Sequence, residues 1–282
     1  MIETITELDA LRERVRGWKR DGLRVAFVPT MGNLHDGHFS LVKRAREHAD
    51  RVVASVFVNP TQFGPNEDFA RYPRTPEADA RGLEAAGCDA MWLPSVETMY
   101  PYGVDATVRV QVPGVTTTLE GASRPGHFDG VATVVSRLFN QVQPDVAVFG
   151  RKDYQQLAVV RYMVRDLAFP IELVGADIVR EASGLALSSR NQYLSGEERA
   201  QAAQISRCLT SMAEAIRAGQ PRAAVEAQAA QRLVEAGFQP DYAVVRRPDF
   251  TEPAHGETGS MVALVAAKLG RTRLIDNLEF DS

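Results

Sequence analysis

Residues 23–38 read LRVAFVPTMGNLHDGH, and this stretch decides the fold of the chain. The run from Leu23 to Val28 is mostly apolar and rich in β-branched and aromatic residues, which predicts a buried strand. After it, Phe39, Val42 and Ala45 recur at helical spacing. The His-x-Gly-His motif of residues 35–38 therefore lies where a strand ends and a helix begins.

This junction suits a nucleoside triphosphate. A helix start offers unpaired main-chain N–H groups and the positive end of the helix dipole. Gly32 and Gly37 allow the backbone to approach a ligand closely because they carry no Cβ. His35 and His38 are three residues apart, so on one helical turn they point the same way and can donate to phosphoryl oxygens.

Two other interpretations of the histidine pair stay open, namely surface residues or two ligands of a metal ion. Zinc usually takes four protein ligands, or three and a water. The other histidines are His48, His127 and His255, and Cys88 and Cys208 belong to no Cys-x-x-Cys pattern. We therefore rank a metal site below a nucleotide site.

The composition is typical of an enzyme that stays in the cytoplasm. The chain has 32 Lys and Arg against 36 Asp and Glu, which gives a formal net charge of −4. It therefore lacks the excess of positive charge that is typical of proteins that bind nucleic acid or anionic membranes. The first twenty residues alternate charged and apolar positions, and no run approaches the ~18 apolar residues of a membrane span. Two widely separated cysteines indicate no disulfide framework.

At 282 residues, the chain is long enough for one large and one smaller domain. Apolar strands alternating with helices indicate a parallel sheet covered on both faces. The strands are predicted at 23–28, 52–58, 90–93 and 146–149, and the later helices at 76–86 and 131–142.

The pattern changes from about Asp177. Ala-rich helices are predicted at 196–218 and 221–236, and short strands near 242–245, 261–266 and 273–275. We therefore predict an α/β protein with a Rossmann-like parallel-sheet domain at residues 1–176 and a smaller C-terminal α/β cap domain at residues 177–282.

Three local patterns give further predictions. Thr4 and Glu7 can form a capping box before a helix. The alternation at Thr107–Val112 predicts a strand that adds an edge to the sheet or pairs with a second subunit. Residues 60–75, rich in Pro, Gly, Asn and Gln, predict a mobile lid or a passive surface loop.

Five further stretches carry a resemblance. They read FVNPTQFG at 57–64, YPRT at 72–75, RPGHF at 124–128, FGRKDYQQ at 149–156 and LSSRN at 187–191. Together with the junction they resemble the pantoate:β-alanine ligase (pantothenate synthetase) family. His-x-Gly-His after a first strand is the signature of its superfamily, the nucleotidylyltransferases, which includes class I aminoacyl-tRNA synthetases. Six ordered motifs make the match specific.

The resemblance implies a ligase that joins pantoate to β-alanine in two steps. The pantoate carboxylate attacks the α-phosphate of ATP to give a pantoyl adenylate and pyrophosphate, and the β-alanine amine then displaces AMP. It also implies Mg²⁺ with ATP, and a homodimer.

The same resemblance implies roles for individual residues. His35, His38, Lys152 and Arg190 are the expected catalytic residues, and Gln62 and Gln156 the pantoate binders, since a neutral amide matches a hydroxy acid. Taken singly, Lys152 could be a solvated lysine, Asp153 a helix cap and Ser188–Ser189 a simple turn. The expected ATP-binding residues are Pro29, Thr30, Met31, Gly32, Gly37, Gly150, Lys152, Asp153, Val179, Leu187, Ser188, Ser189 and Arg190.

Two positions depart from the family pattern. Arg151 stands where the family commonly has glutamate, so it receives no catalytic role. Asp79 matches an acid that helps to hold Mg²⁺, but Ala78 stands where relatives can carry a second acid. Mg²⁺ often keeps its waters and binds substrate phosphates, which leaves the protein's share of metal binding open.

Two other functions are the alternatives. A cytidylyltransferase or adenylyltransferase of the same superfamily would act on a phosphate ester, which calls for Arg or Lys where Gln62 and Gln156 stand. A non-catalytic ATP-binding regulator would not need the complete set of cationic residues.

Overall fold

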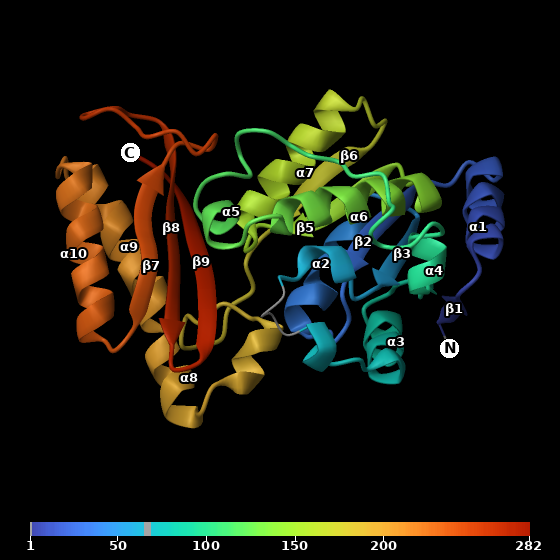
Figure 1. Cartoon of the computed structure of the whole chain (residues 1–282), viewed down its shortest axis with the longest axis horizontal. Helices are drawn as coiled ribbons and strands as arrows, with labels where there is room; N and C mark the ends of the chain where they lie inside the picture. Colours follow the sequence, from blue (N-terminus) through green and yellow to red (C-terminus); the bar gives the residue numbers. More distant parts are fainter. Residues whose placement is uncertain (1, 65–68) are drawn as a thin grey trace. The chain divides into compact units, whose positions relative to one another are not determined.

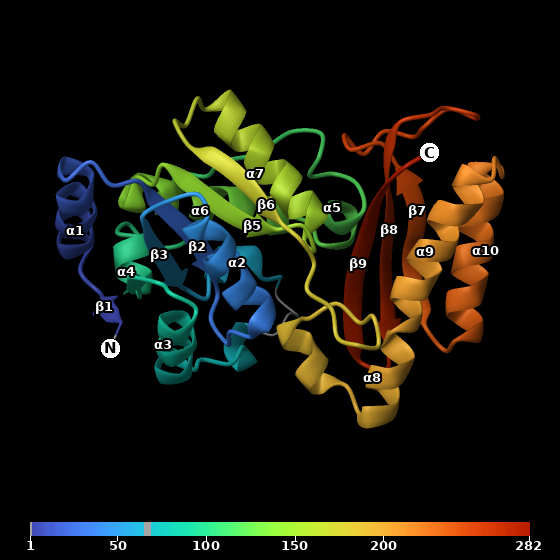
Figure 2. The ribbon, with the colours of Figure 1, turned by 180° about the vertical axis from the view of Figure 1, so that it is seen from behind.

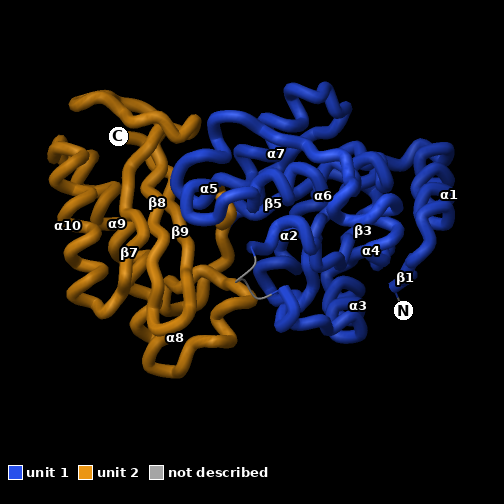
Figure 3. Tube along the Cα trace, viewed as in Figure 1, with its two compact units in different colours: residues 1–151, 155–177 blue, residues 152–154, 178–282 orange. Residues whose placement is uncertain are grey.

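The computed structural model describes residues 2–64 and 69–282. The chain divides into two compact units, Met1–Arg151 with Gln155–Asp177, and Lys152–Tyr154 with Ile178–Ser282 (Figure 3). The sequence-predicted boundary after residue 176 lies one residue before the division at Asp177. The separate assignment of Lys152–Tyr154 has no counterpart in the sequence prediction.

Within the described residues, the first unit contains a six-stranded parallel sheet with strand order β1-β4-β3-β2-β5-β6 (Figure 1). Its central strands β2 and β3 are buried over most of their length, as expected for a sheet covered on both faces. The strands are β1 (Glu3–Ile5), β2 (Val25–Thr30), β3 (Arg51–Val56), β4 (Ala90–Trp92), β5 (Val146–Gly150) and β6 (Glu172–Ala176).

Strand β2 lies beside both β3 and β5. The chain proceeds from β2 to β3 on one side and later places β5 on the other, so the strand order reverses at β2. Open α/β sheets bind ligands at the carboxyl ends of the strands at such a switch point. Residues 31–38 follow the carboxyl end of β2 and so occupy this position.

Helices cover both faces of the sheet (Figures 1 and 2). Residues of α1, α6 and α7 pack with Phe27, Trp92 and Phe149 in one apolar cluster. Residues of α2 and α3 pack with Val28 and Val148 in a second cluster, on the other face. The helices of this part of the chain are α1 (Leu8–Arg20), α2 (Asp36–Arg46), α3 (Pro76–Ala85), α4 (Val96–Met99), α5 (Glu120–Ser123), α6 (His127–Val142) and α7 (Tyr154–Asp166).

The second unit has a three-stranded antiparallel sheet among its described residues, with order β7-β8-β9. Helices α9 and α10 pack against it through one apolar cluster (Figure 2). The predicted helix at 196–218 is divided at Ala203 into α8 and α9. The elements are α8 (Gly196–Ala202), α9 (Gln204–Arg217), α10 (Arg222–Glu235), β7 (Gln239–Arg246), β8 (Ser260–Leu269) and β9 (Thr272–Asp281).

The predicted capping box at Thr4 and Glu7 is wrong. Thr4 lies in β1 and is paired with Met91 of β4. Helix α1 begins at Leu8, and its N-cap residue Glu7 makes no side-chain cap hydrogen bond within the described chain. Thr4 forms part of the edge strand β1 because β4, almost ninety positions further along the chain, provides its main-chain hydrogen-bond partners.

The predicted strand at 107–112 is also absent from the described residues. The main-chain N–H of Val110 donates to the hydroxyl of Thr133 at 2.9 Å, so a side chain takes the place of a neighbouring strand. Val112 is buried and Val108 is 79% exposed, so the alternating valines do not share one covered face.

Residues 60–75 are described only in part, because 65–68 lie outside the described residues. The described flanks contain two short 3-10 helices, η1 (Pro60–Gln62) and η2 (Phe69–Arg71). Phe63 contacts the rings of Phe69 and Tyr72, with centroids 5.4 and 6.0 Å away. No helix in the described chain is both long and apolar enough to span a bilayer.

Candidate active site

The paired histidines begin helix α2. His35 is its N-cap, and the His35 Nδ1 accepts from the N–H of Gly37 at 3.1 Å. The His38 Nδ1 accepts from the N–H of His35 at 3.3 Å, which completes a reciprocal capping box. The two rings lie side by side with centroids 4.1 Å apart, as their three-residue spacing predicts.

These hydrogen bonds determine the tautomer of both rings. A ring nitrogen that accepts an N–H carries no proton, so the neutral imidazoles of His35 and His38 hold their protons on Nε2. Each ring therefore presents an Nε2–H donor at the positive end of a helix dipole. Such donors suit the oxygens of a phosphoryl group on which negative charge develops.

The turn between β2 and α2 depends on Gly32. Its φ of +87° lies in the left-handed region that favours glycine. A Cβ at this position would lie 3.0 Å from Cγ1 of Val56 and 3.1 Å from Oδ2 of Asp79. The sequence predicted that Gly32 serves the approach of a ligand; in the structure, protein atoms also require it.

Asp79, the acid expected to help hold Mg²⁺, accepts three hydrogen bonds from within the protein. Its Oδ1 accepts from the N–H of Leu34 at 2.8 Å and from the hydroxyl of Thr75 at 3.1 Å, and its Oδ2 accepts from the N–H of Asn33 at 3.0 Å. In the described parts of the chain, no group of three or more His, Cys, Asp or Glu side chains could hold a metal ion. Mg²⁺ usually binds through one or two carboxylates, water and substrate phosphates, so it does not require such a cluster.

Gln62 lies at the end of η1, directly after β3, and is buried. Its Oε1 accepts from the side-chain amide of Asn59 at 3.0 Å, and its Nε2 donates to the sulfur of Met31 at 3.0 Å. The amide oxygen already accepts from Asn59, whereas the Nε2 donor has only a weak acceptor, the sulfur, so Nε2 is the atom suited to donate to a ligand oxygen.

Asn59 and Tyr100 form a support for Gln62 that the sequence reasoning missed. Asn59 is 1% exposed, and its Oδ1 accepts from the Tyr100 hydroxyl at 2.5 Å. Burial raises the pKa of Tyr100, so its hydroxyl stays protonated and donates. Asn59 lies inside the FVNPTQFG stretch, which was a signal for it, whereas nothing near Tyr100 in the sequence indicated this contact.

His127, in the RPGHF stretch, contacts the same segment from α6. Its Nδ1 donates to the main-chain carbonyl of Gln62 at 2.8 Å, while its Nε2 lies 2.9 Å from a guanidinium nitrogen of Arg124. Both the side chain and the backbone of Gln62 are thereby held by neighbours.

The two adjacent glutamines of α7 differ. Gln155 is buried, its amide donates to the carbonyls of Val115 and Thr118 at 2.6 and 2.8 Å, and its Oε1 accepts from the N–H of Glu120 at 3.1 Å. Gln156, the residue predicted to bind substrate, is partly exposed. The structure thus gives Gln155 a packing role, whereas Gln156 is only partly buried.

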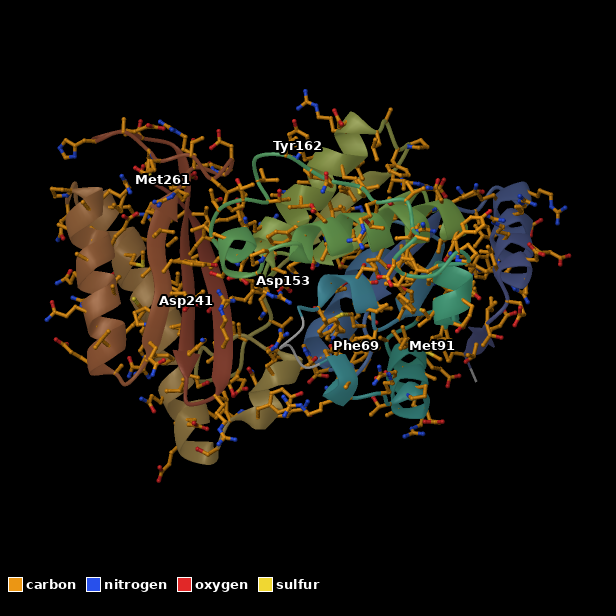
Figure 4. The ribbon with its side chains drawn as sticks, in the orientation of Figure 1. Phe69, Met91, Asp153, Tyr162, Asp241 and Met261 are labelled. Atoms are coloured by element: carbon orange, nitrogen blue, oxygen red, sulfur yellow. The ribbon has the colours of Figure 1, made fainter. Side chains whose placement is uncertain are left out.

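Lys152 and Asp153 belong to the second unit, and Figure 4 labels Asp153. The Lys152 Nζ lies 3.8 Å from Oδ1 of Asp153, and the lysine side chain is 19% exposed. Two contacts attach this short segment to β9: the Asn277 amide donates to the carbonyl of Lys152 at 2.9 Å, and the Tyr154 hydroxyl donates to Glu279 at 3.1 Å. Arg151 instead belongs to the first unit, with Nη1 3.7 Å from Asp177.

Gly150, another predicted ATP-binding residue, ends β5 in the first unit, and a loop of the second unit carries Val179 and residues 187–190. The N–H of Leu187 donates to the carbonyl of Val179 at 2.9 Å. Ser188 then caps the 3-10 helix η3 (Ser189–Tyr193), and its hydroxyl accepts from the N–H of Arg190 at 3.3 Å. Asn191, buried, anchors the turn by donating to the carbonyl of Ala186 at 3.0 Å.

The predicted residues therefore form two groups. In the first unit, the end of β2, the start of α2 and the buried Gln62 gather around the switch point. In the second unit, β9 holds Lys152 and Asp153, and a hydrogen-bonded loop carries Val179 and residues 187–190.

Comparisons with known proteins identify the relatives of the whole chain. A family model described as pantoate-beta-alanine ligase matches residues 3–279. The pantothenate synthetase of Xanthomonas euvesicatoria pv. vesicatoria (strain 85-10) is 69% identical over 280 residues, which cover 99% of this chain and all of the relative. That of Stenotrophomonas maltophilia (strain K279a) is 68% identical over the same share of both chains.

Solved structures are similar over the whole chain. Pantothenate synthetase from Thermus thermophilus superposes with a TM-score of 0.89 at 48% identity, covering 98% of this chain and 99% of that one. Pantoate-beta-alanine ligase from Francisella tularensis, complexed with beta-gamma ATP and β-alanine, has a TM-score of 0.82 at 30% identity, covering 99% of this chain and 97% of that one.

Proposed function

This chain belongs to the pantoate-β-alanine ligase family, and we propose that its own residues perform the family's ATP-dependent condensation of pantoate with β-alanine in the following way. The chain is a ligase that forms a carbon–nitrogen bond and yields pantothenate, AMP and pyrophosphate. The observation that carries the proposed mechanism is the histidine pair at the start of α2, where both Nδ1 atoms accept main-chain N–H groups.

The first step is the formation of pantoyl adenylate. A free carboxylate is a poor acyl donor, and its attack on ATP brings two anions together. Their repulsion at ~4 Å amounts to roughly 1 to 4 kcal/mol per charge pair, depending on the dielectric. The Nε2–H groups of His35 and His38, with the cations Lys152 and Arg190, would offset this repulsion. They would also stabilise the negative charge that develops on the pyrophosphate oxygens.

The proposed ATP-binding residues come from main-chain segments that follow strands of the first unit and from a loop of the second unit. The Asp153 carboxylate would accept from the ribose hydroxyls, and the serines would donate to phosphate. The remaining proposed ATP-binding residues are Pro29, Thr30, Met31, Gly32, Gly37, Gly150, Val179, Leu187, Ser188 and Ser189.

Gln62 and Gln156 are the proposed pantoate binders. Asn59 engages the Oε1 of Gln62, so the Nε2 of that side chain would donate to a carboxylate or hydroxyl oxygen of pantoate. Neutral amides suit this substrate because they add no charge and leave its carboxylate nucleophilic. A phosphate ester, the substrate of the alternative nucleotidylyltransferases, would lack cationic partners at these two positions.

Mg²⁺ is proposed to accompany ATP as its substrate complex, where it neutralises part of the triphosphate charge. The metal ion would be held mainly through the triphosphate oxygens and water, and the residue roles proposed here are those of the protein's own side chains.

Three broader proposals follow from membership of the pantoate-β-alanine ligase family. Residues 1–176 would be the nucleotide- and pantoate-binding domain and 177–282 a cap domain, in a cytoplasmic homodimer. Val108, which is 79% exposed, offers a position at which the proposed dimer can be tested. Analytical ultracentrifugation tests this: Val108→Lys should raise the monomer fraction, and a wild-type monomer at micromolar concentration would overturn it.

The decisive experiment is exchange of labelled pyrophosphate into ATP with pantoate and Mg²⁺ present and β-alanine absent. We expect exchange, because the adenylate and pyrophosphate form reversibly before the amine is needed. A folded protein that makes pantothenate without such exchange would overturn the adenylate mechanism. A protein that binds ATP but releases no AMP with all three substrates would be a regulator instead.

A further inference from the structure

We propose that Asp79 is a positioning residue, which holds the turn at Asn33 and Leu34 in front of the paired histidines, and that it is not a ligand of Mg²⁺. The inference rests on the phosphate role proposed above for His35 and His38, and adds a residue on which their placement depends.

The turn that Asp79 holds has an unusual backbone. Gly32 and Asn33 both have left-handed conformations, with φ of +87° and +53°. Asparagine is among the few non-glycine residues that adopt this region readily. The N–H groups of Asn33 and the next residue, Leu34, both meet the Asp79 carboxylate, at 3.0 and 2.8 Å.

Consecutive N–H groups of this kind form a concavity that binds anions. In many proteins a phosphate fills such a concavity, but here the chain fills it with its own carboxylate. The two N–H groups are thereby directed at Asp79, so phosphate recognition is left to the histidine rings and the helix start that follow.

Burial explains why both oxygens must be hydrogen-bonded. Asp79 is 2% exposed, in the first turn of α3, and a buried carboxylate is tolerated only when donors surround it. The Thr75 hydroxyl, at the N-cap of the same helix, adds a third donor at 3.1 Å. Oδ2 also lies 3.1 Å from where a Cβ of Gly32 would be, so the glycine leaves room for the carboxylate.

A metal ion at Asp79 would compete with these donors. Oδ1 already accepts from Leu34 and Thr75, and Oδ2 from Asn33, so three of the roughly four lone-pair sites of the carboxylate are taken. A shift of the carboxylate toward a metal ion would weaken the hydrogen bonds that hold the turn, so the observed contacts favour the positioning role.

The turn leads directly to the catalytic pair. Leu34 precedes His35, whose N–H donates to His38 and whose ring caps α2. A displaced Leu34 therefore changes the origin of the helix and the direction of both Nε2–H donors. This is the route by which Asp79 acts on the reaction without contact with a substrate.

Asp79→Asn tests the proposal, since an asparagine of nearly the same shape can accept from one main-chain N–H while its amide opposes the other. We expect at least tenfold faster hydrogen exchange at the amides of Asn33 and Leu34, resolved by NMR in the ligand-free protein. The kcat of pantoate-dependent pyrophosphate exchange should fall at least tenfold, whereas the Mg²⁺ concentration for half-maximal rate should change less than twofold. Glu77→Gln is the matched control, since Glu77 is an exposed acid in the same helical turn, and should change none of these quantities.

The outcomes separate the alternatives. Unchanged amide exchange at Asn33 and Leu34, or a tenfold rise in the Mg²⁺ requirement, would overturn the positioning role. If Asp79→Asn does not fold, the same two measurements on Thr75→Val decide: we expect a smaller rise in exchange at both amides, and no rise would count against the proposal. A wild-type protein that lacks pyrophosphate exchange would refute the proposed function, while the amide measurements would still test the turn.

Discussion

The side-chain amide of Asn277 donates to the main-chain carbonyl of Lys152 at 2.9 Å, although 125 positions separate the two residues. Asn277 is 3% exposed in the middle of β9, and its neighbour Asp276 accepts from Arg180 through both oxygens, at 2.6 and 2.9 Å. A bidentate ion pair of this kind is geometrically specific. The main chain of the proposed catalytic residue Lys152 is therefore hydrogen-bonded to a strand that is itself held by this ion pair.

Asn277→Ala should lower kcat about fivefold to tenfold, with little change in KM for ATP. One hydrogen bond contributes roughly 0.5 to 1.5 kcal/mol to holding the backbone of Lys152 in place, and its loss leaves the Lys152 carbonyl without this donor. Steady-state kinetics and Tm measure the effect. Asn140→Ala is the control, since it removes a similar amide-to-carbonyl bond, 3.0 Å long, within α6. An unchanged kcat in a variant of normal Tm would separate Asn277 from the positioning of Lys152.

Lys152→Ala should lower kcat/KM more than about 100-fold, since one preorganised charge contact is worth roughly 3 kcal/mol in the transition state. Its Tm should stay near that of the wild type, because the ion contact of the side chain is with the partly exposed Asp153 at 3.8 Å. Lys268→Ala, at an exposed position of β8, should keep full activity. Activity of Lys152→Ala within tenfold of the wild type would remove this residue from the mechanism.

The histidine pair allows capping and catalysis to be separated. Asparagine is a good N-cap, so His35→Asn should keep α2 and the Tm intact while it removes the Nε2–H donor. His38→Ala loses both its donor and its part in the capping box. Single-turnover adenylation should be slowed at least about 100-fold in both variants, with a loss of Tm only in His38→Ala. A normal adenylation rate in His35→Asn would limit His35 to a structural role.

The two buried thiols should make the free energy of unfolding depend on pH. Burial raises the pKa of Cys88 to about 12 and that of Cys208 to about 11, from 9.0. Because the folded-state pKa is the higher one, this stability is complete below pH 9 and declines as the pH rises toward the folded-state values. Above pH 9, each thiol should cost up to roughly 1.4 kcal/mol of unfolding free energy per pH unit.

Urea unfolding from pH 8 to 10.5 measures this decline, and Cys88→Ala isolates one thiol from the tyrosines and lysines that titrate in the same range. The variant should show a shallower slope than the wild type above pH 9. Parallel slopes would mean that Cys88 does not contribute to the pH dependence.

The sequence alone was sufficient for most of the first unit's architecture. Parallel strands that are covered on both faces must be apolar throughout, so the runs around Val25–Val28 and Val146–Phe149 could be identified without knowledge of their neighbours. The junction at residues 35–38 was equally local, because a strand end, a helix start and three-residue spacing suffice to bring two rings together. These features depend only on the periodicity of apolar residues and on residues close together in the chain, and both can be read directly from the sequence.

What only the tertiary structure decided depends on partners far away along the chain. Thr4 joins a strand because β4 accepts it, and residues 107–112 do not form one because Thr133 takes a main-chain N–H. Both oxygens of Asp79, which the sequence offered as a metal ligand, accept from the turn before His35. Lys152 belongs with β9 because Asn277 reaches its carbonyl. A hydrogen bond between distant residues leaves no periodic trace in the sequence, so these roles became visible only when the chain was folded.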